Sequence, residues 1–307
     1  MPADAVRERI LTFPGPASPG LTLAPQRRGP GDPCYQLDAE RAIWRTSLQA
    51  SGPVTARIYR TAPDTVGCQA WGDGADEFVE ALPALLGVDD APGSYQPQHP
   101  VIQTASKRVP HLRLGRTARV LEALIPAVIE QRVPGADAFR AWRLLVTKFG
   151  TPAPGPAPAR MRVPPPAEVW RRIPSWEFHR ANVDPGRART IIGCAQRADA
   201  LERLSGRPAS AARDALTTLP GVGVWTAAET AQRAFGDTDA LSIGDYHISK
   251  MIGWTLIGTP VDDAGMVELL EPERPHRYRA VRLLEASGLA YKPRFGARLP
   301  VQHISNL

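Results

Sequence analysis

The sequence predicts an α+β protein in which an antiparallel sheet with one helix is followed by a mainly α-helical domain. Residues 1–97 alternate short apolar runs with turns that contain Gly and Pro, a pattern typical of antiparallel strands. Beyond the polar connection at residues 89–99, apolar residues recur at helical spacing. The chain has 307 residues, 43% of them hydrophobic, which is enough for two domains, and we expect these to span 1–97 and 98–307.

Five segments of the first domain alternate as strands do, and one has the spacing of an amphipathic helix. This helix is expected at 75–86, where Phe78 and Leu82 would face the sheet. No side chain in this domain stands out as catalytic. The expected strands cover 9–13, 21–23, 42–46, 54–59 and 65–71.

The second domain shows two long helical patterns, at 117–132 and 138–149, and the first of them ends at Gln131 and Arg132. Residues 151–166 hold seven prolines, so we expect them to form a surface loop inside this domain without regular structure. A basic tail rich in turn residues begins at Lys292. Shorter helices are expected at 167–173, 186–204, 264–270 and 280–287.

A glycine-rich turn lies between a helix that ends near Thr217 and a helix expected from Val224 to about Phe235. We expect the two glycines of this turn to allow backbone angles and close approaches that a Cβ would forbid. The first turn of the second helix leaves N–H groups unpaired at the positive end of its dipole, so it can seat a phosphate. The turn consists of Leu219, Pro220, Gly221, Val222 and Gly223.

A carboxylate follows this hairpin: Gly244 and Asp245 precede a helical run that is expected from Tyr246. An Asp in this position is most often an N-cap, and the hairpin upstream favours a second reading as a reactive carboxylate. Three neighbours compete with it. We expect Asp237 and Asp239 to be solvated turn residues and His247 to face solvent or phosphate.

The run LPGVGVWTA at 219–227, followed by Gly244 and Asp245 at a helix start, resembles the signature of the HhH-GPD DNA glycosylases. The tryptophan at position 225 is a feature shared with the branch that contains the bacterial inducible 3-methyladenine DNA glycosylase. The resemblance covers most of the chain, to about residue 288. It implies that Asp245 is the catalytic carboxylate. It also implies a monofunctional enzyme, because members with lyase activity carry their Schiff-base lysine at the position of Trp225.

The same resemblance assigns further roles to residues of this chain. Besides the turn itself, Trp225 and Thr226 would belong to the hairpin that grips DNA. Gln131 and Arg132 would form a wedge that replaces the flipped nucleotide, although two polar residues at a helix end are also typical of a solvated C-terminus. The pocket for the damaged base would be lined by Trp225, Glu229, Tyr246 and Glu285. A Na⁺ or K⁺ ion would bind the backbone carbonyls of Thr217, Leu219 and Val222.

The chemistry implied by the resemblance is hydrolysis of the bond between sugar C1′ and the base nitrogen. A nearby carboxylate stabilises the positive charge that develops on C1′. Alkylated purines such as 3-methyladenine are expected substrates because they already carry positive charge and leave readily. The family's alkylpurine enzyme has aromatic residues where this chain has Glu229 and Glu285, so the base specificity stays open.

Composition narrows the functional class. The net charge is +6, and it is uneven: residues 1–100 hold 8 Lys+Arg and 12 Asp+Glu, whereas the remainder holds 29 and 19. The basic remainder favours attraction to nucleic-acid phosphates, and solubility is the other reading. Three widely spaced cysteines exclude a disulfide framework and predict no iron–sulfur cluster. Without a long apolar run or a secretory signal, a cytoplasmic, nucleoid-associated monomer that acts on double-stranded DNA is expected.

Two other functions remain open at this stage. One is a helix-hairpin-helix protein that binds DNA structure without catalysis, in which Asp245 is only a cap. The other is a glycosylase with lyase activity, which would use Lys250, one helical turn beyond Asp245.

Overall fold

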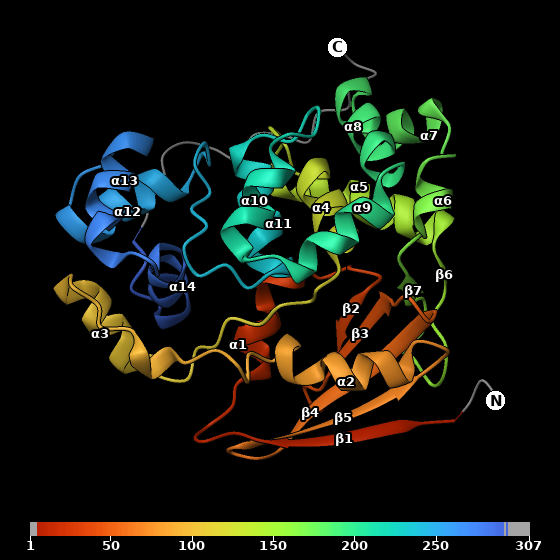
Figure 1. Cartoon of the computed structure of the whole chain (residues 1–307), viewed down its shortest axis with the longest axis horizontal. Coiled ribbons are helices and arrows are strands. Elements are labelled where there is room, and N and C mark those ends of the chain that lie inside the picture. The colour runs from red at the N-terminus through yellow and green to blue at the C-terminus, as the bar shows by residue number, and fades with distance from the viewer. Residues whose placement is uncertain (1–4, 292, 294–307) are drawn as a thin grey trace.

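The computed structural model describes residues 5–291 and 293. Its N-terminal part is a five-stranded antiparallel sheet in the order β1-β5-β4-β3-β2, with helix α2 (Ala75–Leu85) packed on one face through Phe78 and Leu82 (Figure 1). This confirms the predicted fold class. The strands are β1 (Arg7–Thr12), β2 (Tyr35–Leu37), β3 (Ile43–Leu48), β4 (Pro53–Ala62) and β5 (Thr65–Trp71).

One predicted strand is wrong and another strand was not predicted. Residues 21–23 belong to helix α1 (Pro19–Leu23), because Pro19 stands in the first turn, where its fixed φ favours a helix. Strand β2 has only three residues, too few to show an alternating pattern.

The rest of the described chain is mainly helical. Helix α4 (Val120–Ile129) is shorter at both ends than the predicted helix at 117–132. The single helix predicted at 186–204 is instead two helices, separated at Gln196 and Arg197. The other helices are α3 (Pro100–Arg108), α5 (Gly135–Phe149), α6 (Ala167–Trp170), α7 (Ser175–Arg180), α8 (Pro185–Ala195), α9 (Ala198–Glu202), α10 (Ala209–Leu216), α11 (Val224–Ala234), α12 (Ile248–Ile257), α13 (Asp263–Leu270) and α14 (Arg277–Ser287).

Helices α4 and α11 form the centre of the helical core, where small side chains such as Ala227 and Ala231 allow close packing. The two helices run antiparallel. At one end the N–H of Thr117 donates to the carbonyl of Arg233 at 2.9 Å, and at the other end the residues after α4 reach the start of α11. This packing brings the turn after α4 next to the hairpin turn before α11.

The Pro-rich segment at 151–166 is not wholly irregular. Its ends pair as two short strands, β6 (Thr151–Pro152) and β7 (Arg162–Val163), because the prolines leave Val163 able to pair with Thr151. Between them, Met161 packs on the stacked rings of Trp44 and Trp71 from the sheet. The segment therefore covers part of the sheet and joins it to the helical region. No helix of the described residues is long and apolar enough to cross a membrane.

Candidate active site

The hairpin turn lies between α10 and α11, and its two glycines have different roles. Gly221 has a φ of +83°, and a Cβ there would lie 2.0 Å from the Oγ1 of Thr190, so this position requires glycine. Gly223 has a φ of −89°, and no atom lies within 4 Å of the place where its Cβ would be. The expectation of a special backbone angle is therefore wrong for Gly223. Because Gly223 has no side chain, the space in front of α11 is open.

That open space faces the N-terminus of an eleven-residue helix. Gly223 is the N-cap of α11 and supplies no side chain to satisfy the first N–H groups. Val224 next to it is 59% exposed, so the helix end is open to solvent. Backbone donors and the helix dipole point at this opening, which suits an anion such as a phosphate.

Asp245 caps a helix through one carboxylate oxygen and accepts a hydrogen bond from Trp225 through the other. Its Oδ1 accepts the N–H groups of His247 at 2.7 Å and Ile248 at 3.0 Å, so it caps α12, which begins at Ile248 and not at the expected Tyr246. Its Oδ2 accepts the indole N–H of Trp225 at 3.2 Å. The carboxylate is half-buried and held from both sides, beside the first turn of α11.

An exposed aromatic side chain follows the carboxylate. Tyr246 is 74% exposed, and the Nζ of Lys250 lies 4.2 Å from the centroid of its ring. The ring of His247 contacts Tyr246 edge-on. Trp225 and Tyr246 thus place two aromatic rings close to Asp245, along with a lysine that contacts one of them.

The two residues of the expected wedge have different positions in the structure: one contacts the hairpin and the other is exposed. The Nε2 of Gln131 donates to the carbonyl of Gly221 at 2.9 Å and to the Oγ1 of Thr226 at 2.8 Å, so this side chain turns toward the hairpin. Arg132 is exposed and has a φ of +55°, a conformation that residues other than glycine rarely adopt. Arg132 therefore forms the tip of this turn, and Gln131 connects the turn to the hairpin.

Sequence reasoning missed Arg187, which supports this turn from behind. Its buried guanidinium donates to the carbonyl of Ile129 at 2.6 Å and to the carbonyl of Asn182 at 2.9 Å, and it pairs with Asp184. The end of α4 and the corner between α7 and α8 are thereby fixed to each other. The Asp-Pro-Gly start of α8 is visible in the sequence, but nothing in it indicates that the next arginine points inward.

The two glutamates expected to line the base pocket are each paired with an arginine. Glu229 is buried and accepts from the Oγ of Ser242 at 2.5 Å while pairing with Arg233 at 2.7 Å. Burial would raise the pKa of Glu229, but Arg233 and Ser242 outweigh it, so the pKa is lowered. Glu285 is partly exposed and pairs with Arg282 at 2.6 Å. The charge of each is compensated, so neither is placed to attract a cationic base as an unpaired carboxylate.

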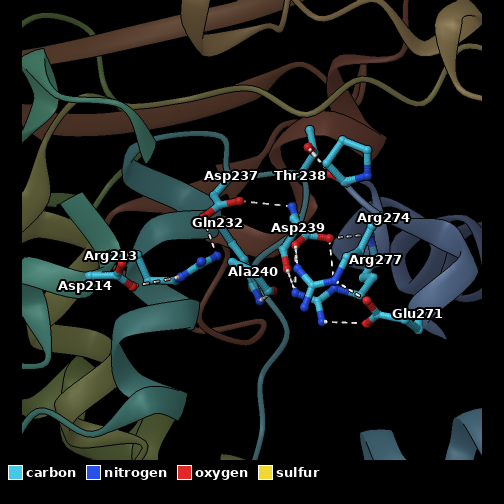
Figure 2. Close-up of polar contacts among 11 residues, drawn as sticks. Arg213, Asp214, Gln232, Asp237, Thr238, Asp239, Ala240, Glu271, Arg274 and Arg277 are labelled. Carbon is cyan, nitrogen blue, oxygen red and sulfur yellow. Dashed lines mark hydrogen bonds and ion pairs between the residues drawn. The ribbon is translucent and has the colours of Figure 1, made fainter. Parts of the chain in front are cut away.

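The loop between α11 and Asp245 is fixed by two other carboxylates, shown in Figure 2. Asp237 pairs with Arg213 of α10 at 2.7 Å and accepts the N–H of Asp239 at 2.9 Å. Asp239 pairs with Arg277 at 2.6 Å and with Arg274 at 3.0 Å. The expectation that these two are solvated turn residues is wrong, because both are buried or nearly so. They anchor the segment that leads to Asp245.

The Asp239 ion pairs predict a stability change in acid. Burial raises the pKa of Asp239, but the hydrogen bonds and charges of Arg277 and Arg274 outweigh it and lower the pKa. A lowered folded-state pKa adds stability above the unfolded value of about 3.9, and this stability is lost as pH falls below about 4. Asp239→Asn should cost about 3 kcal/mol at pH 7 and flatten the acid loss, as measured by urea unfolding at each pH.

Asp214→Asn is the matched control. Asp214 is exposed and lies 4.0 Å from Arg213, so its replacement should leave the pH profile of stability unchanged. Parallel profiles for the wild type and Asp239→Asn would contradict the assignment.

No family model matches the sequence. The structure is similar to the 3-methyladenine DNA glycosylase of Archaeoglobus fulgidus, with a TM-score of 0.74 and 15% identity over 91% of this chain and 98% of that one. It is also similar to the 8-oxoguanine glycosylase/lyase of Clostridium acetobutylicum, solved with double-stranded DNA, with a TM-score of 0.69 and 12% identity over 94% of this chain and 99% of that one.

The sequence is also similar to that of a curated protein. The probable bifunctional transcriptional activator/DNA repair enzyme AlkA of Mycobacterium tuberculosis is 31% identical over 179 residues, which cover 55% of this chain and 32% of that protein. This chain therefore spans about a third of the length of the curated relative. The chain has the fold of the HhH-GPD DNA glycosylases, and its sequence resembles their AlkA-like branch.

Proposed function

We propose that the protein is a monofunctional base-excision-repair DNA glycosylase that hydrolyses the N-glycosidic bond of flipped alkylated purines, such as 3-methyladenine, in double-stranded DNA. The observation that carries this proposal is the position of Asp245. Its carboxylate is held by the indole of Trp225 beside the open N-terminus of α11. A site for phosphate and a site for developing positive charge thus lie next to each other.

Each part of the site has a task in the proposed reaction. The N–H groups at the start of α11 hold a backbone phosphate, and Arg132 fills the space that the flipped nucleotide leaves. The bond from C1′ to the base nitrogen breaks, and the bonding electrons leave with the base. Asp245 stabilises the positive charge on C1′ until water adds there and releases a proton. An alkylated purine that carries positive charge leaves as a neutral base.

The aromatic rings near Asp245 support the substrate class. Trp225 and Tyr246 are aromatic residues of the kind that bind a cationic base, although Lys250 already lies over the ring of Tyr246, and Glu229 is compensated by Arg233. The structural relatives include both alkylpurine and 8-oxoguanine enzymes. The proposal is tested by incubating the protein with methylated DNA and with DNA containing 8-oxoguanine and identifying the released bases. Release of 8-oxoguanine alone would contradict the alkylpurine assignment.

A monovalent cation at the hairpin is also proposed, held by the carbonyls of Thr217, Leu219 and Val222. The oxygen of Leu219 accepts the N–H of Val222 at 3.0 Å and keeps a second lone pair, so the turn is compatible with an ion. Bound there, the ion would add positive charge next to a DNA phosphate.

The monofunctional assignment predicts that borohydride will trap no covalent complex with DNA. By the family resemblance Trp225 stands where lyase members carry their nucleophilic lysine, and the Nζ of Lys250 lies over the ring of Tyr246. Denaturing gel electrophoresis after borohydride treatment provides the measurement. An adduct that disappears in Lys250→Gln would show lyase chemistry and overturn this part of the proposal.

A further inference from the structure

The positive charge of the chain is concentrated next to the hairpin and not within it. Residues 131–197 contain 12 Lys+Arg and 4 Asp+Glu, a net charge of +8. Residues 198–307, which include the hairpin and Asp245, contain 12 and 13, a net charge of −1. Within the basic remainder of the chain, the excess charge is therefore not carried by the hairpin region. The excess belongs to the segment that runs from the turn after α4 through α8.

The acidic residues of this basic segment are largely engaged. Asp137 is buried, and Asp184 is paired with Arg187. Glu177 is buried and pairs with Lys148 at 2.6 Å and with Arg180 at 3.4 Å. The exposed surface of the segment is therefore dominated by cations.

An exposed patch of one aromatic and several basic residues lies on α7 and just before it. Trp176 is 64% exposed, although a tryptophan usually buries most of its surface. The side chain of Arg180 is 73% exposed, and Arg172 and His179 are also exposed. Helical spacing puts Trp176, His179 and Arg180 on one side of α7, and Arg172 stands three residues before the helix begins. We call Arg172, Trp176, His179 and Arg180 the α7 patch.

The α7 patch is rigidly joined to the turn that carries Arg132. Arg180 lies two residues before Asn182, and Arg132 lies three residues after Ile129. The guanidinium of Arg187 bonds to the carbonyls of both Asn182 and Ile129. Figure 1 shows α7 beside α8 at the upper right of the view, with the hairpin helices α10 and α11 nearer its centre.

We propose that the α7 patch binds the sugar-phosphate backbone of the undamaged strand, next to the nucleotide opposite the flipped one. The hairpin and Asp245 serve the damaged strand, and Arg132 stands between the two surfaces. A six-residue helix is about 9 Å long, and one strand rises about 3.4 Å per nucleotide, so the patch can follow about two or three nucleotides. Arginines pair with phosphates, and Trp176 packs on sugar or base. This inference rests on the proposed function.

The test compares Arg172→Gln/Arg180→Gln with the wild type on two probes, a duplex with a stable abasic-site analogue and its lesion strand alone. Binding is measured by fluorescence anisotropy between 50 and 200 mM salt. If each arginine neutralises one phosphate, the slope of log affinity against log salt concentration for the duplex should become less steep by about 1.8. Between 50 and 200 mM salt the variant should therefore lose about tenfold less duplex affinity than the wild type loses. The slope for the single strand should be the same for both proteins.

Lys107→Gln/Arg108→Gln, on exposed positions of α3, removes the same charge elsewhere and should leave both slopes unchanged. Trp176→Ala, which changes no charge, should weaken duplex binding several-fold with the slope unaltered. An unaltered duplex slope in the Arg172/Arg180 variant would overturn the proposal. An equal fall on both probes would also overturn it, because the contact would then not belong to the second strand. If the wild type itself fails to bind the duplex, the glycosylase proposal fails first.

Discussion

Replacing Asp245 with Asn is expected to lower the rate of base excision by at least a factor of about 100 while DNA binding is retained. In the proposed reaction the carboxylate supplies the negative charge that stabilises C1′ as the base departs, and a neutral amide cannot supply it. Binding should persist because the proposed phosphate site is formed by the N–H groups at the start of α11 and not by Asp245. Single-turnover release of modified base from methylated DNA gives the rate, and anisotropy with an abasic-site duplex gives the affinity.

This substitution leaves the fold almost unchanged, which makes the result interpretable. The Oδ1 of Asn can still accept the N–H groups of His247 and Ile248, and Asn caps helices as well as Asp does. The bond from Trp225 to Oδ2 is lost, at about 1 kcal/mol. The free energy of unfolding should therefore change by no more than about 1–2 kcal/mol.

Asp262→Asn is a matched control, because Asp262 caps α13 by accepting the N–H of Gly265 at 2.9 Å. It should leave excision unchanged. Equal rates for wild type and Asp245→Asn would reduce Asp245 to a helix cap and favour a DNA-binding protein without catalysis.

The second large effect is expected from Gly223→Ala, which should weaken DNA binding about tenfold or more at every sequence. A methyl group there meets no protein atom within 4 Å, so the obstacle arises only when a phosphate approaches the first turn of α11. Hydrogen bonds to a charged phosphate contribute about 1.5–3 kcal/mol each, and losing one corresponds to about a tenfold loss or more. Titration of several unrelated duplexes by anisotropy tests both the size and the sequence independence.

Gly221→Ala separates this effect from simple damage to the turn. Its positive φ and the 2.0 Å approach to Thr190 predict a loss of stability of about 2–4 kcal/mol, seen in urea unfolding. Gly223→Ala should change stability by less than about 1 kcal/mol. If Gly223→Ala bound DNA like the wild type, the phosphate would have to bind elsewhere.

Local patterns account for the parts of the site that the sequence could predict. The turn at 219–223, the start of α11 at Val224 and the cap at Asp245 depend on residues within a few positions of one another, and the structure has all three. Four of the five strands, α2 and the helical region also lie where alternation and helical spacing placed them, whereas β2 was not predicted and residues 21–23 form a helix. Element boundaries were less certain, because α4 loses residues at both ends and a break divides the helix predicted at 186–204.

Long-range pairing accounts for most of what the sequence could not predict. From the sequence, Gln131 fits a wedge and a solvated helix end equally well. Its hydrogen bonds to Gly221 and Thr226, 90 and 95 residues away, show that its side chain points toward the hairpin. The sequence suggests Glu229 as a pocket residue, and the structure shows that it pairs with Arg233 on the same helix and accepts a hydrogen bond from Ser242, 13 residues away.

The sequence by itself determined the order of sheet and helices, the glycine turn before α11 and the acid that follows it, because turn chemistry, capping and hydrophobic periodicity act over short distances. Only the tertiary structure decided that the indole of Trp225 meets the carboxylate of Asp245, and that Arg187 ties the end of α4 to the corner after α7. These bonds join groups that are distant in the chain. Their partners are selected by how α4, α8 and α11 pack, and no local pattern records that packing.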